Sequence, residues 1–172
     1  MLRLIGCILV AGGCMGLGYW YRLQFTGRVK HLKILIGIVD MMMSEVRYSK
    51  ASLPECFRRL SGRLNDPYQL CFYEIWEEAR KNDGEPIHEI FVRKMKECME
   101  KVPLLKEEKI LFLEWAGNYG FEDTTMQLGS MEQCKEHLKA LMQNLEREVV
   151  EKGKMAMGLG TLGGLLLIII LL

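Results

Sequence analysis

Histidines, cysteines and paired carboxylates are the side chains of this 172-residue sequence that could form a metal or catalytic site. Cys134 and His137 stand three positions apart, so they would share one face of a helix and could supply half of a metal site. His31 and His88 share no ligand spacing with them, and no third and fourth ligands are evident. We therefore expect a core cysteine beside a surface histidine, and no bound metal.

Motifs for the common catalytic chemistries are missing from the sequence. It contains no G-x-x-x-x-G-K-[ST] phosphate loop, no G-x-S-x-G and no H-E-x-x-H. The carboxylate pairs Glu77-Glu78 and Glu107-Glu108 have Arg80 or Lys109 nearby, which predicts solvated ion pairs on helical surfaces. We expect no catalytic residue, no cofactor and no small-molecule substrate, so the protein is predicted not to be an enzyme.

The six cysteines form neither a disulfide framework nor a zinc signature, because no C-x-x-C pair occurs among them. Most stand at apolar positions of predicted helices. They are expected to be small core residues in a reducing compartment. They are Cys7, Cys14, Cys56, Cys71, Cys98 and Cys134.

The C-terminal stretch Met155–Leu172 contains no charged residue and follows directly after Lys152 and Lys154. As a helix it would be about 27 Å long, close to the thickness of a bilayer's hydrocarbon core. The alternative is a core helix of a large soluble domain, which rarely has so little polar surface. We predict a transmembrane helix over residues 153–172.

The N-terminal stretch is also apolar, with Arg3 as its only charge before the aromatic and basic exit Trp20-Tyr21-Arg22. We predict a transmembrane helix over residues 1–22. One alternative is a cleavable signal peptide, although no A-x-A site follows. Another is a lipoprotein, because Ala11-Gly12-Gly13-Cys14 resembles a lipidation box in which Ala replaces the usual Leu.

Both predicted anchors carry a G-x-x-x-G spacing, formed by Gly12 and Gly16 in the first and by Gly160 and Gly164 in the second. Small residues four apart let helices approach closely in lipid, so the anchors could pack together or against a partner; the alternative is that Gly is simply common in such helices. The excess of Lys and Arg after the first anchor and before the second predicts that residues 23–152 are cytoplasmic.

Residues 23–152 are predicted to form an all-α bundle of about six helices, because apolar residues recur at helical spacing and no segment alternates as a strand does. The first and last helices should be antiparallel neighbours, since both lead to the membrane. The last helix leads into the second anchor with no intervening Pro, and Gly153 is the only plausible hinge between them. The first helix carries the stripe Leu32, Leu35, Val39, Met42 and Val46; the last carries Met131, Cys134, Leu138, Leu141, Leu145 and Val149.

Charge is distributed unevenly although the net charge is only +1, which gives no reason to expect nucleic-acid binding. Residues 22–63 hold nine Lys and Arg against three Asp and Glu, whereas residues 66–136 hold nine against sixteen. The basic part suits an anionic membrane surface, and the acidic part could dock a basic partner; a solvated helical surface is the alternative for both. Four carboxylates are the candidate docking residues: Glu77, Glu78, Glu85 and Glu89.

The order of several short motifs resembles the stage III sporulation protein AB family of endospore-forming bacteria. Residues 44–48 resemble the family's Glu-Ile-x-Tyr helix end, and Ser52-Leu53-Pro54 its Thr-Pro-Leu with Pro and Leu exchanged. Residues 112–127 resemble its L-x-x-x-G-x-x-L-G-x-x-D-x-x-x-Q stretch, with Tyr119 in place of Leu. Residues 159–164 resemble its closing LG-x-L-x-G.

The resemblance implies a membrane protein of the mother cell, in a secretion-like channel complex that spans the two membranes around the forespore. The family's soluble domain is similar to the cytoplasmic domain of the type II secretion platform protein. By this analogy the protein is a scaffold or adaptor that links a cytoplasmic ATPase, stage III sporulation protein AA, to the membrane assembly. The resemblance carries no catalytic residues.

Overall fold

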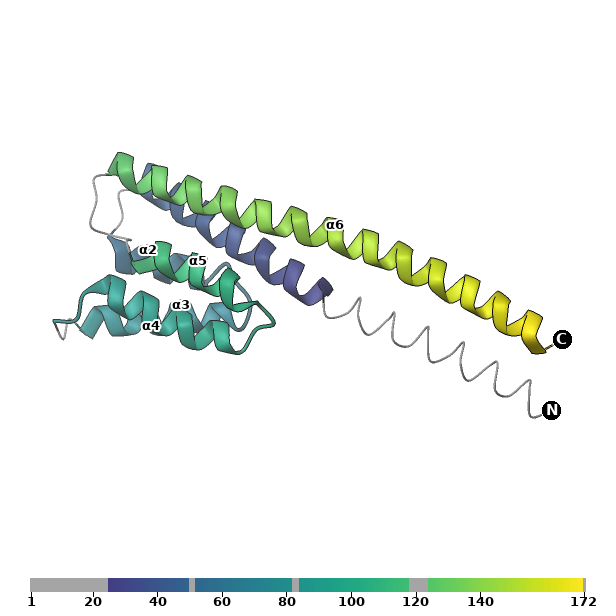
Figure 1. The fold of residues 1–172 in the computed structure, drawn as a ribbon. Helices are drawn as coiled ribbons and strands as arrows, with labels where there is room; N and C mark the ends of the chain where they lie inside the picture. The colour runs from purple at the N-terminus through teal and green to yellow at the C-terminus, as the bar shows by residue number, and fades with distance from the viewer. Residues whose placement is uncertain (1–24, 50–51, 82–83, 118–123, 172) are drawn as a thin grey trace. The chain divides into compact units, whose positions relative to one another are not determined.

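The computed structural model describes residues 25–49, 52–81, 84–117 and 124–171, and all of the secondary structure in these ranges is helical (Figure 1). This confirms the predicted all-α class and about six helices. In order, the elements are an α-helix over residues 25–44 that continues as the π-helix η1 (Glu45–Ser49), α2 (Leu53–Ser61), α3 (Tyr68–Lys81), α4 (Ile87–Glu100), α5 (Lys106–Gly117) and α6 (Thr124–Leu171).

Within the part of the chain that is described, no helix combines the length and the apolar character needed to cross a membrane. The first predicted anchor, residues 1–22, lies outside the described residues, together with Gly12 and Gly16. In the second, residues 153–172, the structure describes a helical backbone as far as Leu171. Both anchors therefore remain predictions.

Two compact units divide the chain. One is Lys30–Leu141; the other joins residues 1–29 to residues 142–172, of which 25–29 and 142–171 are described. In the second unit, the guanidinium of Arg28 lies over the Phe25 ring, 5.7 Å from its centroid. The bundle and the candidate docking residues all belong to the unit Lys30–Leu141.

The 25–44 helix supplies an aliphatic part of the core, as its stripe predicted. Leu32, Leu35, Val39 and Met42 are fully buried, whereas Val46 is only half-buried. Asp40 Oδ1 on this helix lies 3.2 Å from Lys135 Nζ on α6, and the two helices run in opposite directions (Figure 1). The predicted antiparallel contact of the first and last helices is thus confirmed within this unit.

Aromatic rings fill the core between α2, α3, α4 and α5. Phe91 of α4 is central: its ring centroid lies 5.3 Å from that of Phe57 on α2 and 5.9 Å from that of Phe72 on α3. Phe112 and Trp115 of α5 pack edge to face, 5.1 Å apart, and both also contact the Phe91 ring. Such ring pairs add about 0.5–1.5 kcal/mol each beyond their area burial, so these four short helices share one aromatic core.

Backbone hydrogen bonds define the starts of α2 and α3. Ser52 occupies the N-cap position of α2, but its side chain makes no capping hydrogen bond. Before α3, the backbone N–H groups of Tyr68 and Gln69 donate to the Asn65 carbonyl. The helix therefore begins at Tyr68, one residue after Pro67.

Glu108 corrects one prediction. We expected it to form a solvated ion pair, but it is buried, and its Oε2 accepts a 2.7 Å hydrogen bond from the backbone N–H of Leu105. Glu108 is the third residue of α5, so this bond is the glutamate half of a capping box. The carboxylate therefore stabilises the start of a helix.

Helix α6 is 48 residues long and shows no interruption at Gly153, in agreement with the expected continuity of the last helix and the second stretch. Met131 and Leu138 of its predicted stripe are fully buried, while Leu141 and Val149 are half-buried. Cys134 is buried and His137 is exposed, so the expected arrangement of a core cysteine beside a surface histidine is confirmed.

Candidate partner-docking surface

Three of the four candidate docking carboxylates lie close to Arg93 of α4. Arg93 Nη2 donates to Glu78 Oε1 of α3 at 2.6 Å and to Glu85 Oε2, just before α4, at 2.9 Å. Glu89 stands one helical turn before Arg93 on the same helix face. The sequence therefore identified side chains that are close in space, but it did not identify the arginine between them.

Lys94 extends this ionic group along the seam between α3 and α4. Its Nζ lies 3.2 Å from Glu74 Oε2 and 3.5 Å from Glu78 Oε2. The hydrogen bond from Arg93 is the main cause that lowers the pKa of Glu78, and its effect outweighs the opposing effect of partial burial. Arg93 and Lys94 therefore neutralise much of the negative charge that was predicted to attract a basic partner.

Glu77 and Glu89 retain more of their charge for a partner. Glu77 is exposed, and no ion pair joins it to another residue that the structure describes. Glu89 is 59% exposed, and its Oε1 lies 3.9 Å from His88 Nε2. These two carboxylates are therefore the available part of the predicted acidic surface.

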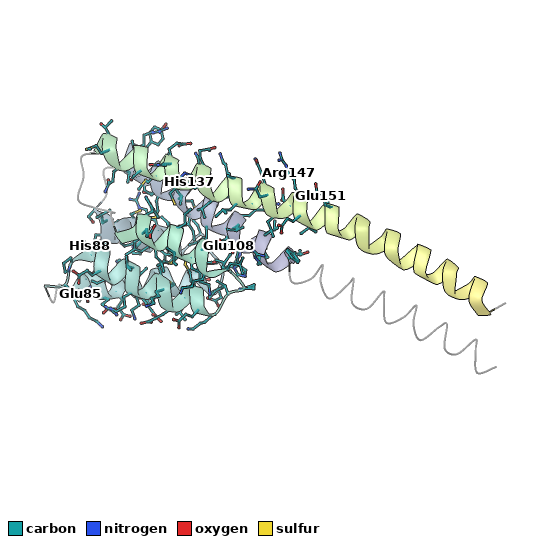
Figure 2. All side chains as sticks on the ribbon, in the orientation of Figure 1. Glu85, His88, Glu108, His137, Arg147 and Glu151 are labelled. Atoms are coloured by element: carbon teal, nitrogen blue, oxygen red, sulfur yellow. The ribbon has the colours of Figure 1, made fainter. Side chains whose placement is uncertain are left out.

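An open groove of about 720 Å³ runs along the outer face of α4 and reaches Gly117 at the end of α5. Figure 2 shows Glu85 and His88 at the same end of this helix. Glu97 and Glu100 continue the acidic side of the groove, and Lys96 adds a cation beside Arg93. The spacing of 89, 93, 97 and 100 places these residues on one helical face, a signal in the sequence that the prediction of four docking carboxylates missed.

Aromatic side chains lie beside Glu77 on α3. The ring centroids of Tyr73 and Trp76 are 5.4 Å apart, and the Arg80 guanidinium lies over the Trp76 ring at 5.1 Å. Tyr73 is 46% exposed and Leu70 is 54% exposed. Trp, Tyr and Arg are the residues that most often dominate binding energy at protein interfaces, so this face of α3 offers apolar contacts of its own, apart from the residues that line the groove of α4.

The described residues contain no group of three or more His, Cys, Asp or Glu side chains arranged to hold a metal ion. Six of the nine residues that line the groove are charged, with both signs present, and the groove is open to solvent, unlike the concave pockets that enclose most of a small molecule. Such a surface is suited to recognising another protein through charge and hydrogen bonds.

Fold and surface together define the class of this protein, an all-helical bundle with an open, charged groove on its fourth helix. The chain belongs to the stage III sporulation protein AB family, whose sequence model matches residues 3–172. This match confirms the resemblance that the short motifs suggested.

A solved structure described as stage III sporulation protein AB (SpoIIIAB) has the same fold, with a TM-score of 0.66. It is 16% identical to this chain, and the alignment covers 72% of this chain and 97% of the other. Comparison with curated proteins found no significant match.

Proposed function

We propose that this protein is a non-enzymatic, membrane-anchored adaptor of a sporulation complex between the mother cell and the forespore. Its helical bundle would hold a cytoplasmic ATPase against a secretion-like channel assembly. The observation that carries the proposal is the family match over residues 3–172, because that family consists of stage III sporulation proteins. The open charged groove supports a role in binding another protein.

The apolar stretches 1–22 and 153–172 support attachment of the protein to the mother-cell membrane that faces the forespore. Lys152 and Lys154 before the second stretch favour a cytoplasmic bundle. Gly160 and Gly164, with Gly12 and Gly16, would allow close packing of the two anchors or of partner anchors. Replacing Gly160 and Gly164 with Leu should reduce co-purification of complex partners in mild detergent, and unchanged recovery would exclude this packing role.

The docking surface in this proposal is the exposed face formed by Tyr73, Trp76 and Glu77 on α3 and by Glu89 and Glu97 on α4. Glu78 and Glu85 contribute less, because Arg93 already neutralises them. Long-range attraction to a basic partner would mainly set the rate of association, whereas the aromatic residues would set how slowly the complex dissociates.

Binding of the full-length protein in lipid nanodiscs to purified stage III sporulation protein AA tests this proposal. Glu77→Lys with Glu89→Lys should weaken binding about tenfold at low salt, while circular dichroism shows a folded protein. Glu107→Lys with Glu136→Lys is the matched control, since these exposed carboxylates lie on α5 and α6. Equal binding by both variants at low and moderate salt would exclude this surface as the docking site.

A second candidate function places the bundle outside the cytoplasm, as a lipoprotein or a membrane-active regulator, because Ala11-Gly12-Gly13-Cys14 resembles a lipidation box. An engineered cysteine at Glu107, in a chain without its native cysteines, separates the two topologies. Glu107 is exposed on α5. It is a better position for the new cysteine than the turn at Gly84, where φ is 85°, a left-handed conformation that side chains other than glycine rarely adopt. Labelling by a membrane-impermeant thiol reagent only after cell lysis supports the cytoplasmic orientation; labelling in intact cells overturns it.

A further inference from the structure

Two thiols meet at the seam between α3 and α4. Cys71 Sγ is in hydrogen-bond contact with the Lys94 carbonyl oxygen at 3.4 Å, and Cys98 Sγ with the Pro67 carbonyl oxygen at 3.7 Å. Pro67 O also accepts the backbone N–H of Cys71. Likewise, Lys94 stands four residues before Cys98 on α4, where a helix pairs its carbonyl with the Cys98 N–H. Each thiol therefore contacts the backbone turn of the other cysteine, so both sulfurs lie at the same level of the seam.

The interaction between the two neighbouring thiols makes them chemically unequal. This interaction is the main cause that lowers the pKa of Cys98; the positive charge of Lys101 also lowers it, and burial opposes both. The same interaction and burial raise the pKa of Cys71. Cys98 is therefore the better nucleophile of the pair, because the thiolate is the species that attacks a disulfide.

The other two described cysteines lack these features. Burial raises the pKa of Cys56 and of Cys134 to about 12, so neither thiol forms a thiolate readily near neutral pH. They have nearly the same exposed fraction as Cys71 and Cys98, which lies between 3% and 5% for all four. Cys134 is therefore a matched internal control that differs in electrostatics rather than in burial.

We propose that Cys71 and Cys98 are a reversible modification site, at which exchange with a low-molecular-weight disulfide forms a cross-link between α3 and α4. The Cys98 thiolate attacks one sulfur of the small disulfide, whose S–S bond breaks and releases one thiolate. The Cys71 sulfur, after losing its proton to that leaving thiolate, attacks Cys98 Sγ and releases the second. The net reaction converts two protein thiols and one small disulfide into one protein disulfide and two small thiols.

The cross-link would join α3, which carries Glu78, covalently to α4, which carries Arg93, and so would prevent the two helices from separating. A disulfide between these helices removes conformations from the unfolded chain, so the oxidised protein should melt several degrees higher than the reduced protein. The proposal concerns only the chemistry of this thiol pair and stands independently of the proposed adaptor role.

Oxidation of the full-length protein in detergent micelles by a graded series of oxidised to reduced glutathione ratios tests the site. Free thiols are then blocked with N-ethylmaleimide, and peptides are analysed by mass spectrometry. We expect one linked peptide pair containing Cys71 and Cys98, with loss of two hydrogens, and a thiol that remains free at Cys134. Modification of Cys134 as fast as of Cys98, or no linked pair under the most oxidising ratio, would overturn the proposal.

Substitutions separate the two steps. In Cys71→Ser, which keeps a polar hydroxyl beside Cys98, the mixed disulfide at Cys98 should accumulate because the resolving thiol is missing. In Cys98→Ser, no adduct should form at Cys71 at a comparable rate. Cys134→Ala should form the Cys71–Cys98 cross-link at the same rate as the chain without substitutions. Equal rates of adduct formation at Cys71 and Cys98 in the two single variants would overturn the assigned order of attack. This test measures adducts directly, so its result does not depend on whether the cross-link changes the melting temperature.

Discussion

Interior and surface polar contacts of this bundle use the same side-chain types in different surroundings. Glu45, at the start of η1, is 8% exposed and contacts Arg59 of α2 at 3.0 Å and Arg63 at 3.9 Å. Glu78, on the outer seam, is 30% exposed and contacts Arg93 at 2.6 Å. The shorter contact is not the more important one for stability, because water can replace the partners of Glu78, which is 30% exposed, more readily than those of the buried Glu45.

The surroundings of Glu45 show that its site is desolvated. Burial is the main cause that raises the pKa of the neighbouring Cys56 to about 12, and the Glu45 charge raises it further. Arg59 and Arg63 are themselves 43% and 58% exposed. Two partly solvated cations therefore neutralise one buried carboxylate, and removal of the cations should cost more than removal of the carboxylate.

The largest predicted effect follows from removing both cations. Arg59→Met with Arg63→Met leaves Glu45 buried without a partner, so the free energy of unfolding should fall by about 2–4 kcal/mol. Urea denaturation measures this change. Adding Glu45→Gln should recover part of the loss, because a neutral amide is cheaper to bury. A double variant as stable as the unmodified chain would contradict the assignment of Glu45 as an interior charge.

The corresponding change at the surface should be smaller. Arg93→Met removes the contacts to Glu78 and Glu85, which are both substantially exposed, so the free energy of unfolding should fall by no more than about 1 kcal/mol. The difference should shrink further in high salt. If urea denaturation gave a loss as large as for the Arg59 and Arg63 pair, the distinction between interior and surface contacts would fail.

A second interior contact gives a pH test. His31 Nδ1 lies 3.2 Å from the hydroxyl of the fully buried Tyr68, and burial, followed by the nearby Lys30 charge, lowers the pKa of His31. The unfolded chain then binds a proton at His31 more readily than the folded chain. Stability contributed by the neutral ring is present above the unfolded pKa of about 6.5 and falls as the pH drops below it.

Thermal melts between pH 7.5 and pH 5.5 measure this effect. The unmodified chain should lose stability toward pH 5.5, and His31→Gln should lose less. Tyr68→Phe is the control and should keep the pH dependence, because burial rather than the hydroxyl is the main cause of the lowered pKa. An identical pH dependence in His31→Gln would assign the effect to other groups.

The smallest stability effect is expected at the carboxylates that are most available to a partner. Glu77→Lys with Glu89→Lys should change the free energy of unfolding by less than about 0.5 kcal/mol, since exposed positions tolerate substitution. Urea denaturation of this variant, beside its binding assay, separates docking from folding. A large stability loss would show that these residues hold the bundle together.

Sequence periodicity predicted the helical class and the stripes of the first and last helices, because helical spacing reports which face of a segment is buried. The antiparallel contact of these two helices was predicted on another ground, the apolar stretch at each end of the chain. It also predicted that Cys134 is a core residue and that His137 is exposed. It did not predict the role of Glu108, whose capping bond depends on where α5 begins. Nor did it show that Arg93 binds Glu78 and Glu85, because these residues come from two helices and the turn between them.

The sequence alone determined the all-α class and, through ordered short motifs, membership of a sporulation family, because both depend on local patterns along the chain. Only the tertiary structure decided which charges are interior, which are neutralised at the surface, and that Cys71 and Cys98 are in contact. The physical reason is that desolvation and pairing depend on neighbours from other helices. Glu45 and Glu78 have the same side chain, and only their packing separates a structural charge from a surface one.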